Sequence, residues 1–281
     1  MSPRTWLITG ASGGIGRALA ELVLDRGDRA ALCARDVSGL AGLVAAHPER
    51  AMPVTVDLTD AVAVDVALGD AVARLGGVDV LVNNAGVGSF GAVEELADAE
   101  LLAVLAVNVF GPLRALRAVL PGMRARRAGH IIQVSSVRGL AADAGFGAYA
   151  AAKFALEGLS EALAAEVGPL GIAVSVIEPG ALRTRWAGRA AWSAATIADY
   201  AGTVGALRSF LAAHDGAQPT DPREVAVHIA ALGAAAPTPG LTRHILGSDA
   251  VVRVRAKLAA LAAAVSAADG DHRSRRNDVG D

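Results

Sequence analysis

The sequence has little of what marks several classes of protein. It contains one cysteine, Cys33, so no internal disulfide can form, and its first residues lack the charged, apolar, small-residue order of a signal peptide. No apolar run approaches the roughly 18 uninterrupted residues of a membrane span. A formal net charge of −2 provides no basic surface for nucleic acid. We therefore expect a cytoplasmic protein with no membrane or nucleic-acid partner.

Aromatic residues are also scarce, at 4%, whereas hydrophobic residues make up 53% of the 281 residues. The core must therefore consist mainly of Ala, Val, Leu and Gly, whose small side chains suit close packing of helices on a sheet. The six histidines are scattered without i, i+4 pairing or a nearby carboxylate cluster, so we expect no metal site. The length allows one large α/β domain or two small ones, and we favour one.

Short runs rich in branched residues alternate with helical patterns. We expect strands at residues 5–9, 29–33, 52–57, 78–82, 130–134, 172–177 and 242–246. We expect helices at residues 14–25, 37–46, 61–75, 98–120, 147–167 and 221–234. This alternation predicts right-handed crossovers between parallel strands, in a sheet that helices cover on both faces.

Two segments interrupt this alternation. Residues 181–220 are longer than an ordinary connection and carry an unusual share of the aromatic residues, so we expect a lid over a binding site; these residues are Trp186, Trp192, Tyr200 and Phe210. Residues 251–268 form an alanine-rich helical pattern, and the charged residues 269–281 are expected to be a disordered tail.

A glycine-rich turn, TGASGGIG at residues 9–16, lies between the first strand and the first helix. Such a turn directs backbone N–H groups and the positive end of the helix dipole at one point, which suits a pyrophosphate. Two other interpretations exist for the turn by itself. Residues 10–14 also match G-x-S-x-G, the elbow that presents a serine nucleophile, and glycines can serve only a tight connection.

A second constellation consists of Ser136, Tyr149 and Lys153. Tyr149 and Lys153 are i and i+4, so they share one helix face. A phenol has a pKa of about 10, and an adjacent ammonium stabilises its phenolate, which makes the pair a general acid. Ser136 follows the strand at residues 130–134, and parallel sheets place ligands at such strand ends. Y-x-x-x-K alone is common by chance.

Together these motifs resemble the short-chain dehydrogenase/reductase family. The resemblance spans residues 4–250 and rests on motifs in the family's order, namely TGASGGIG at residues 9–16, NNAG at residues 83–86, Asn108, Ser136, Tyr149, Lys153 and Pro179-Gly180. The serine-elbow interpretation leaves Tyr149 and Lys153 unexplained. The resemblance implies a single domain at residues 1–250 with a Rossmann-type, doubly wound parallel sheet in three layers.

The resemblance also implies which residues bind a dinucleotide. The pyrophosphate would be lined by Gly10, Ser12, Gly14, Ile15 and Gly16, and the adenine would be faced by Asp57 and Leu58. Packing under the cofactor is implied for Asn84, Ala85 and Gly86. The nicotinamide end would be held by Pro179, Gly180 and Thr184. For Asp57 the alternative is a simple strand cap. Asn83 is expected to be structural.

The implied activity is hydride transfer between nicotinamide and a ketone or aldehyde, or the corresponding alcohol. Tyr149 would donate the proton and Ser136 would hydrogen-bond the carbonyl, while Lys153 would also bond the nicotinamide ribose. Asn108 would hold a water in a proton relay, although a helix kink is its alternative role. Two other functions remain open: a non-redox relative such as an epimerase or dehydratase, and a catalytically silent cofactor-binding protein.

The second strand carries the signal for cofactor choice. NAD users place a carboxylate at its end, against the ribose 2′-hydroxyl, and here that position is Ala34. Arg35 follows and suits a 2′-phosphate, whereas Asp36 is expected to cap the next helix. We therefore expect NADP(H) in preference to NAD(H).

Opposite charges follow the catalytic serine, at Arg138 and Asp143, where related sequences usually have small or apolar residues. They predict a polar or anionic group on a small-molecule substrate, with Phe146, Trp186 and Trp192 as further contacts. The alternative is that the two charges pair with each other or point to solvent.

Three phrases resemble the branch of 17β-hydroxysteroid and retinol-type dehydrogenases: residues 92–96, 154–167 and 246–250. The family resemblance further implies a homodimer through the helices at residues 98–120 and 147–167. The small or apolar residues Ala151, Ala155, Leu159 and Ala162 permit such an interface.

Overall fold

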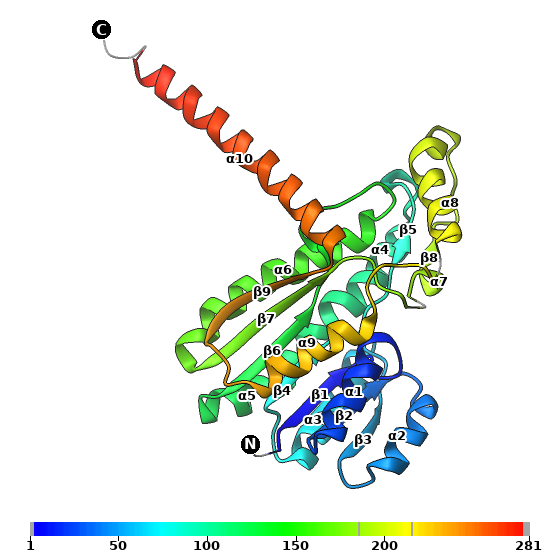
Figure 1. Ribbon diagram of the computed structural model, residues 1–281, viewed down its shortest axis with the longest axis vertical. Helices are drawn as coiled ribbons and strands as arrows, with labels where there is room; N and C mark the ends of the chain where they lie inside the picture. The colour runs from blue at the N-terminus through cyan, green and yellow to red at the C-terminus, as the bar shows by residue number, and fades with distance from the viewer. Residues whose placement is uncertain (1–2, 185, 215, 278–281) are drawn as a thin grey trace.

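The computed structural model describes residues 3–184, 186–214 and 216–277. Its centre is a sheet of seven parallel strands in the order β3-β2-β1-β4-β6-β7-β9 (Figure 1). The strands are β1 (Thr5–Thr9), β2 (Arg29–Ala34), β3 (Ala51–Thr55), β4 (Val80–Asn83), β6 (Gly129–Val134), β7 (Ile172–Pro179) and β9 (Gly240–Leu246). Chain order reverses between β1 and β4, which is where doubly wound sheets bind ligands.

Helices cover both faces of the sheet, as predicted. One face packs against α1 (Gly14–Asp25), α2 (Ala41–Ala46) and α9 (Pro222–Ala234), and the other against α3 (Ala61–Leu75), α5 (Gly111–Arg126) and α6 (Gly147–Val167). Side chains alternate along each strand, so Trp6 and Ile8 enter the first core and Leu7 the second. Cys33 is buried in the second core, and this burial raises the pKa of its thiol to about 12.

The helix predicted at residues 98–120 is interrupted. It consists of α4 (Asp98–Leu105), a π-helical turn at Ala106–Phe110, and α5, which continues to Arg126. The Asn108 side chain accounts for the interruption, because its Oδ1 accepts from Val87 N (2.9 Å) and its Nδ2 donates to Val87 O (2.8 Å). Such π-helical turns occur often at functional sites.

The two ends of the segment at residues 181–220 lie side by side. Leu182 forms a bridge with Thr220, and Arg183 N donates to Thr220 O at 2.9 Å. Between them lie α7 (Trp186–Arg189), β8 (Ala191–Trp192) and α8 (Ala206–Ala213). The strand β8 pairs with β5 (Ser89–Phe90), so the segment is attached to the chain that follows β4.

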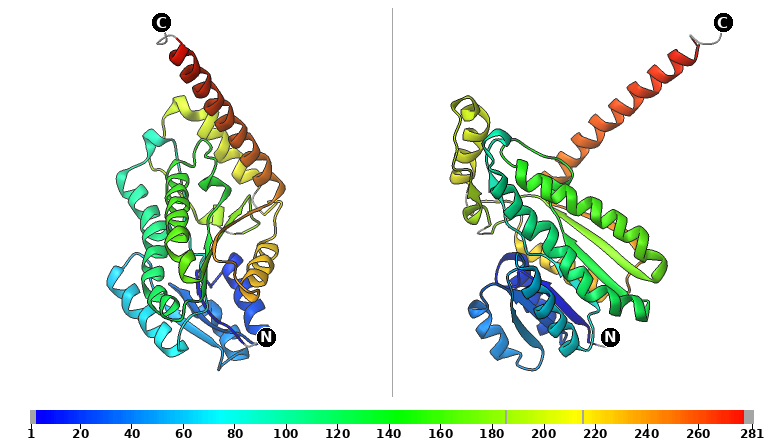
Figure 2. Two further views of the ribbon diagram at one scale, coloured as in Figure 1. Left: turned by 90° about the vertical axis from the view of Figure 1, so that its left-hand side faces the viewer. Right: turned by 180° about the vertical axis from the view of Figure 1, so that it is seen from behind.

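The last helix, α10 (Ser248–Asn277), projects away from the domain (Figure 2). Its first turns are attached to the domain, because Ala250 and Val254 form a small cluster with Val137. The helix is longer than expected. Residues 269–277, which composition assigned to a disordered tail, continue it, and the rest of that tail lies outside the described residues.

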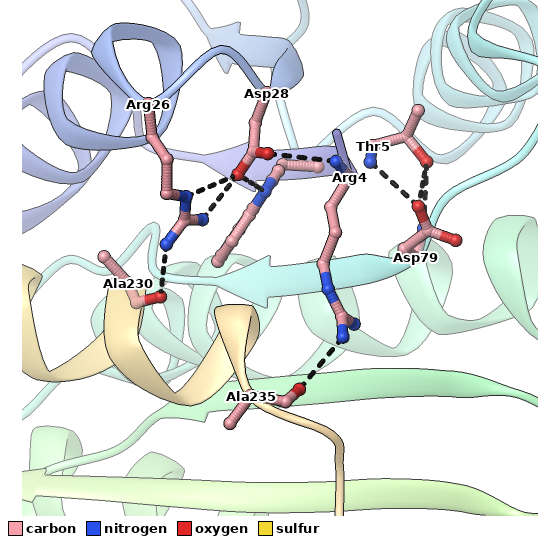
Figure 3. Close-up of polar contacts among 8 residues, drawn as sticks. Arg4, Thr5, Arg26, Asp28, Asp79, Ala230 and Ala235 are labelled. Carbon is pink, nitrogen blue, oxygen red and sulfur yellow. Dashed lines mark hydrogen bonds and ion pairs between the residues drawn. The ribbon is translucent and has the colours of Figure 1, made fainter. Parts of the chain in front are cut away.

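A buried carboxylate organises the sheet end opposite the glycine turn. Asp28, 4% exposed, accepts from Arg4 N (2.9 Å), Trp6 Nε1 (2.9 Å) and Arg26 Nε (3.0 Å). Figure 3 shows Asp28 between Arg4 and Arg26, and Arg26 also donates to the carbonyl of Ala230 on α9 (2.9 Å). These contacts join β1, the α1–β2 turn and α9, far from the strand ends that carry the candidate site.

Candidate active site

The glycine turn is built for close backbone approach. Gly10 and Gly14 have positive φ angles, 68° and 54°, which glycine adopts without a steric penalty. A Cβ on Gly16 would lie 2.4 Å from Gly10 O, and one on Gly10 would lie 2.9 Å from Ala85 Cα. Substituting either glycine would therefore displace the backbone of the turn.

The residues after β4 are attached to this turn. Thr9 Oγ1 accepts from the backbone N–H groups of Asn84 (3.0 Å) and Ala85 (3.1 Å), and Asn84 Nδ2 donates to Thr9 O (2.9 Å). Across the turn, the Thr184 methyl lies 3.5 Å from the position of a Gly14 Cβ. Three segments predicted to bind the cofactor therefore meet at one point.

The turn also fits an anionic group. In the described residues, no side chain caps the N-terminus of α1 at Gly13, and no acidic residue lies in the first turn. The first N–H groups of that helix are thus not occupied by a side-chain acceptor, which suits a pyrophosphate. This arrangement fits the dinucleotide that the sequence motifs predict.

Residues at the end of β2 and after β3 lie where the adenine end would bind. β2 ends at Ala34, as the cofactor argument requires, and the following Arg35 is exposed. Asp36 is engaged by the backbone, since it accepts from Ser38 N at 2.8 Å. Asp57 accepts from Thr59 N at 2.9 Å, and this bond, with a smaller contribution from the charge of Arg35, lowers the pKa of its carboxyl.

Ser136, Tyr149 and Lys153 converge at the carboxyl end of β6. Ser136 follows the strand, and its hydroxyl lies near enough to the Tyr149 hydroxyl to lower the pKa of Tyr149. Lys153 is 3% exposed and donates from Nζ to Val134 O at 2.8 Å. A Cβ on Gly86 would lie 3.8 Å from Lys153 Nζ and 3.4 Å from Asn108 Oδ1, so Gly86 passes between these two residues.

Burial controls the ionisation of the Tyr149 and Lys153 side chains. It raises the pKa of Tyr149 to about 12, against the Ser136 hydrogen bond and the charge of Arg138, which lower it. Burial lowers the pKa of Lys153 to about 8, against the charge of Glu157, which raises it. The sequence prediction that Lys153 lowers the Tyr149 pKa is not supported here, since Nζ lies 5.7 Å from the ring centre and bonds Val134.

Aromatic residues from three segments gather beside Tyr149. The Trp186 ring lies 4.7 Å from the Tyr149 ring, centroid to centroid. Phe90 is fully buried, and the sequence motifs did not indicate it. Its ring centroid lies 5.1 Å from that of Phe146, 5.9 Å from that of Trp186 and 4.9 Å from that of Trp192. Phe90 stands out only as one of five phenylalanines, located four residues after the NNAG motif.

Arg138 and Asp143 form an ion pair, which is one of the two arrangements left open by the sequence. The Arg138 guanidinium lies 4.4 Å above the Phe146 ring, and 14% of its side chain is exposed. Asp143 also pairs with Arg253 of α10, a contact that the sequence did not indicate. Two guanidinium groups therefore share one carboxylate next to Tyr149.

A second buried ionic cluster continues along α6. Arg243 of β9 pairs with Glu157 (2.7 Å), Glu161 (2.5 Å) and the fully buried Glu178 of β7. Glu157 lies one helical turn beyond Lys153. The sequence motifs did not indicate this cluster, although Glu157 and Glu161 repeat the i, i+4 spacing of Tyr149 and Lys153 on the same helix.

Glu178 predicts a pH dependence of stability. Burial, with the charge of Glu157, raises its pKa from 4.5 to about 7. The folded state therefore binds more protons than the unfolded state in this window, so stability is full below pH 4.5 and falls as pH rises to about 7. Glu178→Gln should flatten the pH dependence of the free energy of unfolding between pH 5 and 8, by on the order of 2 kcal/mol.

Urea unfolding at the two pH values measures this effect. Glu166→Gln, at an exposed position on α6, is the matched control and should keep the wild-type pH dependence of the free energy of unfolding. An equal pH dependence of the free energy of unfolding in Glu178→Gln and wild type would show that Glu178 does not titrate in this range.

Comparison with known proteins supports the assignment of the motifs. A model of the short chain dehydrogenase family matches residues 4–195. Oxidoreductase BOA17 of Botryotinia fuckeliana is 37% identical over 250 residues, which is 88% of this chain and 90% of that protein. Human retinol dehydrogenase 8 is 42% identical over 196 residues, which is 67% of this chain and 62% of that protein. The second match is consistent with the resemblance to retinol-type enzymes.

Solved structures share the fold over nearly the whole chain. A short-chain dehydrogenase from Streptomyces avermitilis has a TM-score of 0.88 and 42% identity, over 97% of this chain and 99% of that one. A metagenomic short-chain oxidoreductase in complex with NADP has a TM-score of 0.69 and 30% identity, over 88% and 99%. A Burkholderia phymatum short chain dehydrogenase/reductase in complex with NAD has a TM-score of 0.79 and 25% identity, over 90% and 92%.

Proposed function

Because this chain belongs to the short-chain dehydrogenase family, we propose that it is an NADP-dependent oxidoreductase that interconverts a ketone or aldehyde and the corresponding alcohol. The observation that carries the proposal is the convergence of Ser136, Tyr149 and Lys153 beside an uncapped glycine turn. A nicotinamide dinucleotide bound at this site would supply the hydride. Gly10, Gly14 and the first turn of α1 would hold its pyrophosphate, and Thr184, across the turn from Gly14, would contact the adjoining nicotinamide half.

The side chains of this chain supply the proton chemistry. In the reduction direction, the Tyr149 hydroxyl donates a proton to the carbonyl oxygen, while Ser136 donates a hydrogen bond to the same oxygen. Tyr149 carries its proton near neutrality, because burial raises its pKa to about 12, so it can be the donor in this direction. Lys153 would bond the ribose, and Asn108 fixes the loop at Val87 from its π-helical turn.

The reaction is tested by following the absorbance of NADPH with a panel of ketones and aldehydes. We expect consumption that depends on the carbonyl compound and forms the alcohol. Conversion of a sugar or hydroxyacyl compound without net NADPH consumption would favour an epimerase or dehydratase. Binding of NADPH without any turnover would favour a silent cofactor-binding protein.

Arg35 is the residue that we propose selects NADP(H). The carboxylate of Asp36, which could recognise the ribose of NAD, is occupied by Ser38, and Arg35 is exposed at the end of β2. A charge-assisted bond to a phosphate contributes about 1.5–3 kcal/mol. Arg35→Ala should therefore lower kcat/KM with NADPH about 10- to 100-fold and leave the value with NADH nearly unchanged.

Asp36→Asn is the control for Arg35→Ala, because its amide oxygen can still accept from Ser38. It should keep the wild-type preference between the two cofactors. An equal or better kcat/KM with NADH in the wild-type enzyme would contradict the assignment of NADP(H).

We further propose that the substrate carries an anionic group that binds near Arg138. Arg138 and Arg253 share the carboxylate of Asp143 beside Tyr149, and the charge of Asp249 also acts on Arg138. The guanidinium N–H groups of Arg138 that Asp143 does not use would bind the anionic group. The rings of Phe146, Trp186 and Trp192 would contact the apolar remainder. Arg138→Ala should raise KM for a keto acid about tenfold or more, and raise KM for its methyl ester much less.

Kinetics with this acid and ester pair measure the effect of Arg138→Ala. Arg74→Ala is the control, because that guanidinium is 59% exposed on α3, where it pairs with Asp70. Equal changes in KM for the acid and the ester would give Arg138 a structural role only.

The homodimer proposed from the family resemblance has a suitable surface. Leu102, Phe110, Phe154 and Leu159 are 39–62% exposed on α4, the π-helical turn and α6, and Ala151, Ala155 and Ala162 are exposed on α6 as well. An 18-residue window within Asp98–Arg126 has a mean hydropathy of 1.6, so this run is long and apolar enough to span a membrane by composition. Here α5 packs in the second core of the domain, so we propose that a second copy covers the exposed face.

A further inference from the structure

The large aliphatic residues of α10 follow a heptad repeat. Val251, Val254, Leu258, Leu261 and Val265 are separated by three and four residues in alternation, the spacing of a and d positions in a coiled coil. The stripe begins on the domain, where Val254 is 7% exposed. Beyond Val254 it continues along the part of the helix that projects from the domain (Figure 2).

The outer part of the stripe faces solvent in the single chain. Leu258, Leu261 and Val265 are 59%, 49% and 62% exposed. In the alanine-rich stretch from residue 255 to 268 they are the only aliphatic residues larger than alanine, and all three fall on the repeat. Helices in proteins are stabilised mainly by packing an apolar face against another surface rather than by helix propensity. The stripe therefore needs a partner surface.

The residues at positions e and g, which flank the apolar stripe, suit pairing with a second copy of this helix that runs antiparallel. In the repeat, Arg255 and Lys257 hold positions e and g near the domain, and Asp269 and Asp271 hold the same positions two heptads later. In a parallel pair each g position faces the following e position of the partner, so Arg255, Lys257 and Asp269 would face alanines, and only Asp271 would face an opposite charge, at Arg276. An antiparallel pair places Arg255 opposite the position of Asp269, and Lys257 opposite that of Asp271, because e faces e and g faces g in that arrangement.

The same register aligns the apolar positions. It sets Leu261 opposite Val265 and Leu258 opposite Ala268, which are the a-to-d layers of an antiparallel coiled coil. Between the charged ends, the e and g positions are Ala262 and Ala264, whose small side chains let two helices approach closely. Charge thus favours this alignment over the one shifted by a heptad, in which Leu258 would face Leu261 but Arg255 and Lys257 would face Ala262 and Ala264.

We propose that α10 is an assembly helix that pairs antiparallel with α10 of a second copy of this chain. The pair would hold two domains at opposite ends of the coiled coil, and it uses none of the surface on α4, α5 and α6 that we assign to the homodimer. The first turns of each α10 contain Arg253, which pairs with Asp143 near Tyr149.

Sedimentation velocity on the full chain tests the pairing. The double variant Leu258→Glu/Leu261→Glu should have half the mass of wild type, whether the smaller unit is one chain or a dimer through α6. Val252→Glu is the matched control, because Val252 is 67% exposed on the same helix but lies off the stripe. Equal masses for wild type and the double variant over the micromolar range would overturn the proposal.

Engineered cysteines test the direction of the pair, since Cys33, the only natural cysteine, is buried. In the antiparallel register, position 258 lies opposite 268 and about 15 Å along the axis from its own copy, at 1.5 Å per residue. A mixture of Leu258→Cys and Ala268→Cys chains should therefore form a disulfide on mild oxidation with copper phenanthroline. Neither variant alone should form an intermolecular disulfide under the same conditions. Cross-linking of each variant to itself would contradict the antiparallel arrangement.

Discussion

Replacing Tyr149 with phenylalanine is expected to remove nearly all turnover while leaving the affinity for the cofactor largely unchanged. The variant keeps the ring that packs 4.7 Å from Trp186 and loses only the hydroxyl, which lies near Ser136. A positioned acid or base contributes about 10²- to 10⁴-fold in rate. We therefore expect kcat to fall by about that factor, as measured with a confirmed carbonyl substrate, with the Kd for NADPH within about twofold of wild type.

Tyr200→Phe is the control for Tyr149→Phe, since the sequence has only these two tyrosines. The Tyr200 hydroxyl donates to Glu94 at 2.5 Å, which is not one of the residues assigned to catalysis, so this variant should keep wild-type turnover. Wild-type turnover in Tyr149→Phe would show that the acid is a different group.

Lys153→Ala should damage both turnover and cofactor binding. The ammonium is buried and donates to Val134 O at 2.8 Å, and it lies beside Gly86, under the position that we assign to the cofactor. Hydrogen bonds to charged groups contribute about 1.5–3 kcal/mol. The Kd for NADPH, measured by fluorescence titration, should therefore rise about 10- to 100-fold, and kcat should fall by at least about 10²-fold.

Lys257→Ala, which removes the only other lysine, should change neither kcat nor the Kd for NADPH. Circular dichroism of Lys153→Ala separates loss of function from loss of fold. A folded Lys153→Ala protein with wild-type cofactor affinity would restrict Lys153 to a structural role at the end of β6.

The sequence predicts the central part of this fold well, because strong local patterns specify it. β1, α1, α3 and α6 begin and end at the predicted residues, since branched runs, glycine turns and helical periodicity agree there. Ser136, Tyr149 and Lys153 come together because parallel strands bring their carboxyl ends to one edge. The glycine turn and the NNAG segment lie side by side for the same reason.

What the sequence could not predict depends on contacts between distant residues. Asp143 and Arg253 are 110 positions apart, and no local pattern links them. His228 and His244, which look scattered in the sequence, have ring nitrogens 3.0 Å apart because α9 and β9 bring them together. The break in the helix at Ala106–Phe110 likewise depends on the bond of Asn108 to Val87, in a segment that precedes it.

The pKa of Tyr149 shows the same limit at the site itself. The i, i+4 spacing correctly places Lys153 on the same helix as Tyr149, and it predicts that the ammonium stabilises the phenolate. In the folded chain the ammonium instead bonds Val134, and burial raises the Tyr149 pKa to about 12. Spacing along a helix fixes which residues are neighbours, but it does not fix the solvation of each group or its nearest charge.

Transfer of deuterium from labelled NADPH to a carbonyl compound tests the proposed reaction most directly. The enzyme is incubated with NADPH deuterated at nicotinamide C4, on each face in turn, and a ketone that it consumes, and the product is analysed by mass spectrometry. We expect deuterium on the carbinol carbon from one face only, and no labelled product with Tyr149→Phe. A product without deuterium from either face, formed at the same rate by Tyr149→Phe, would contradict hydride transfer with Tyr149 as the acid.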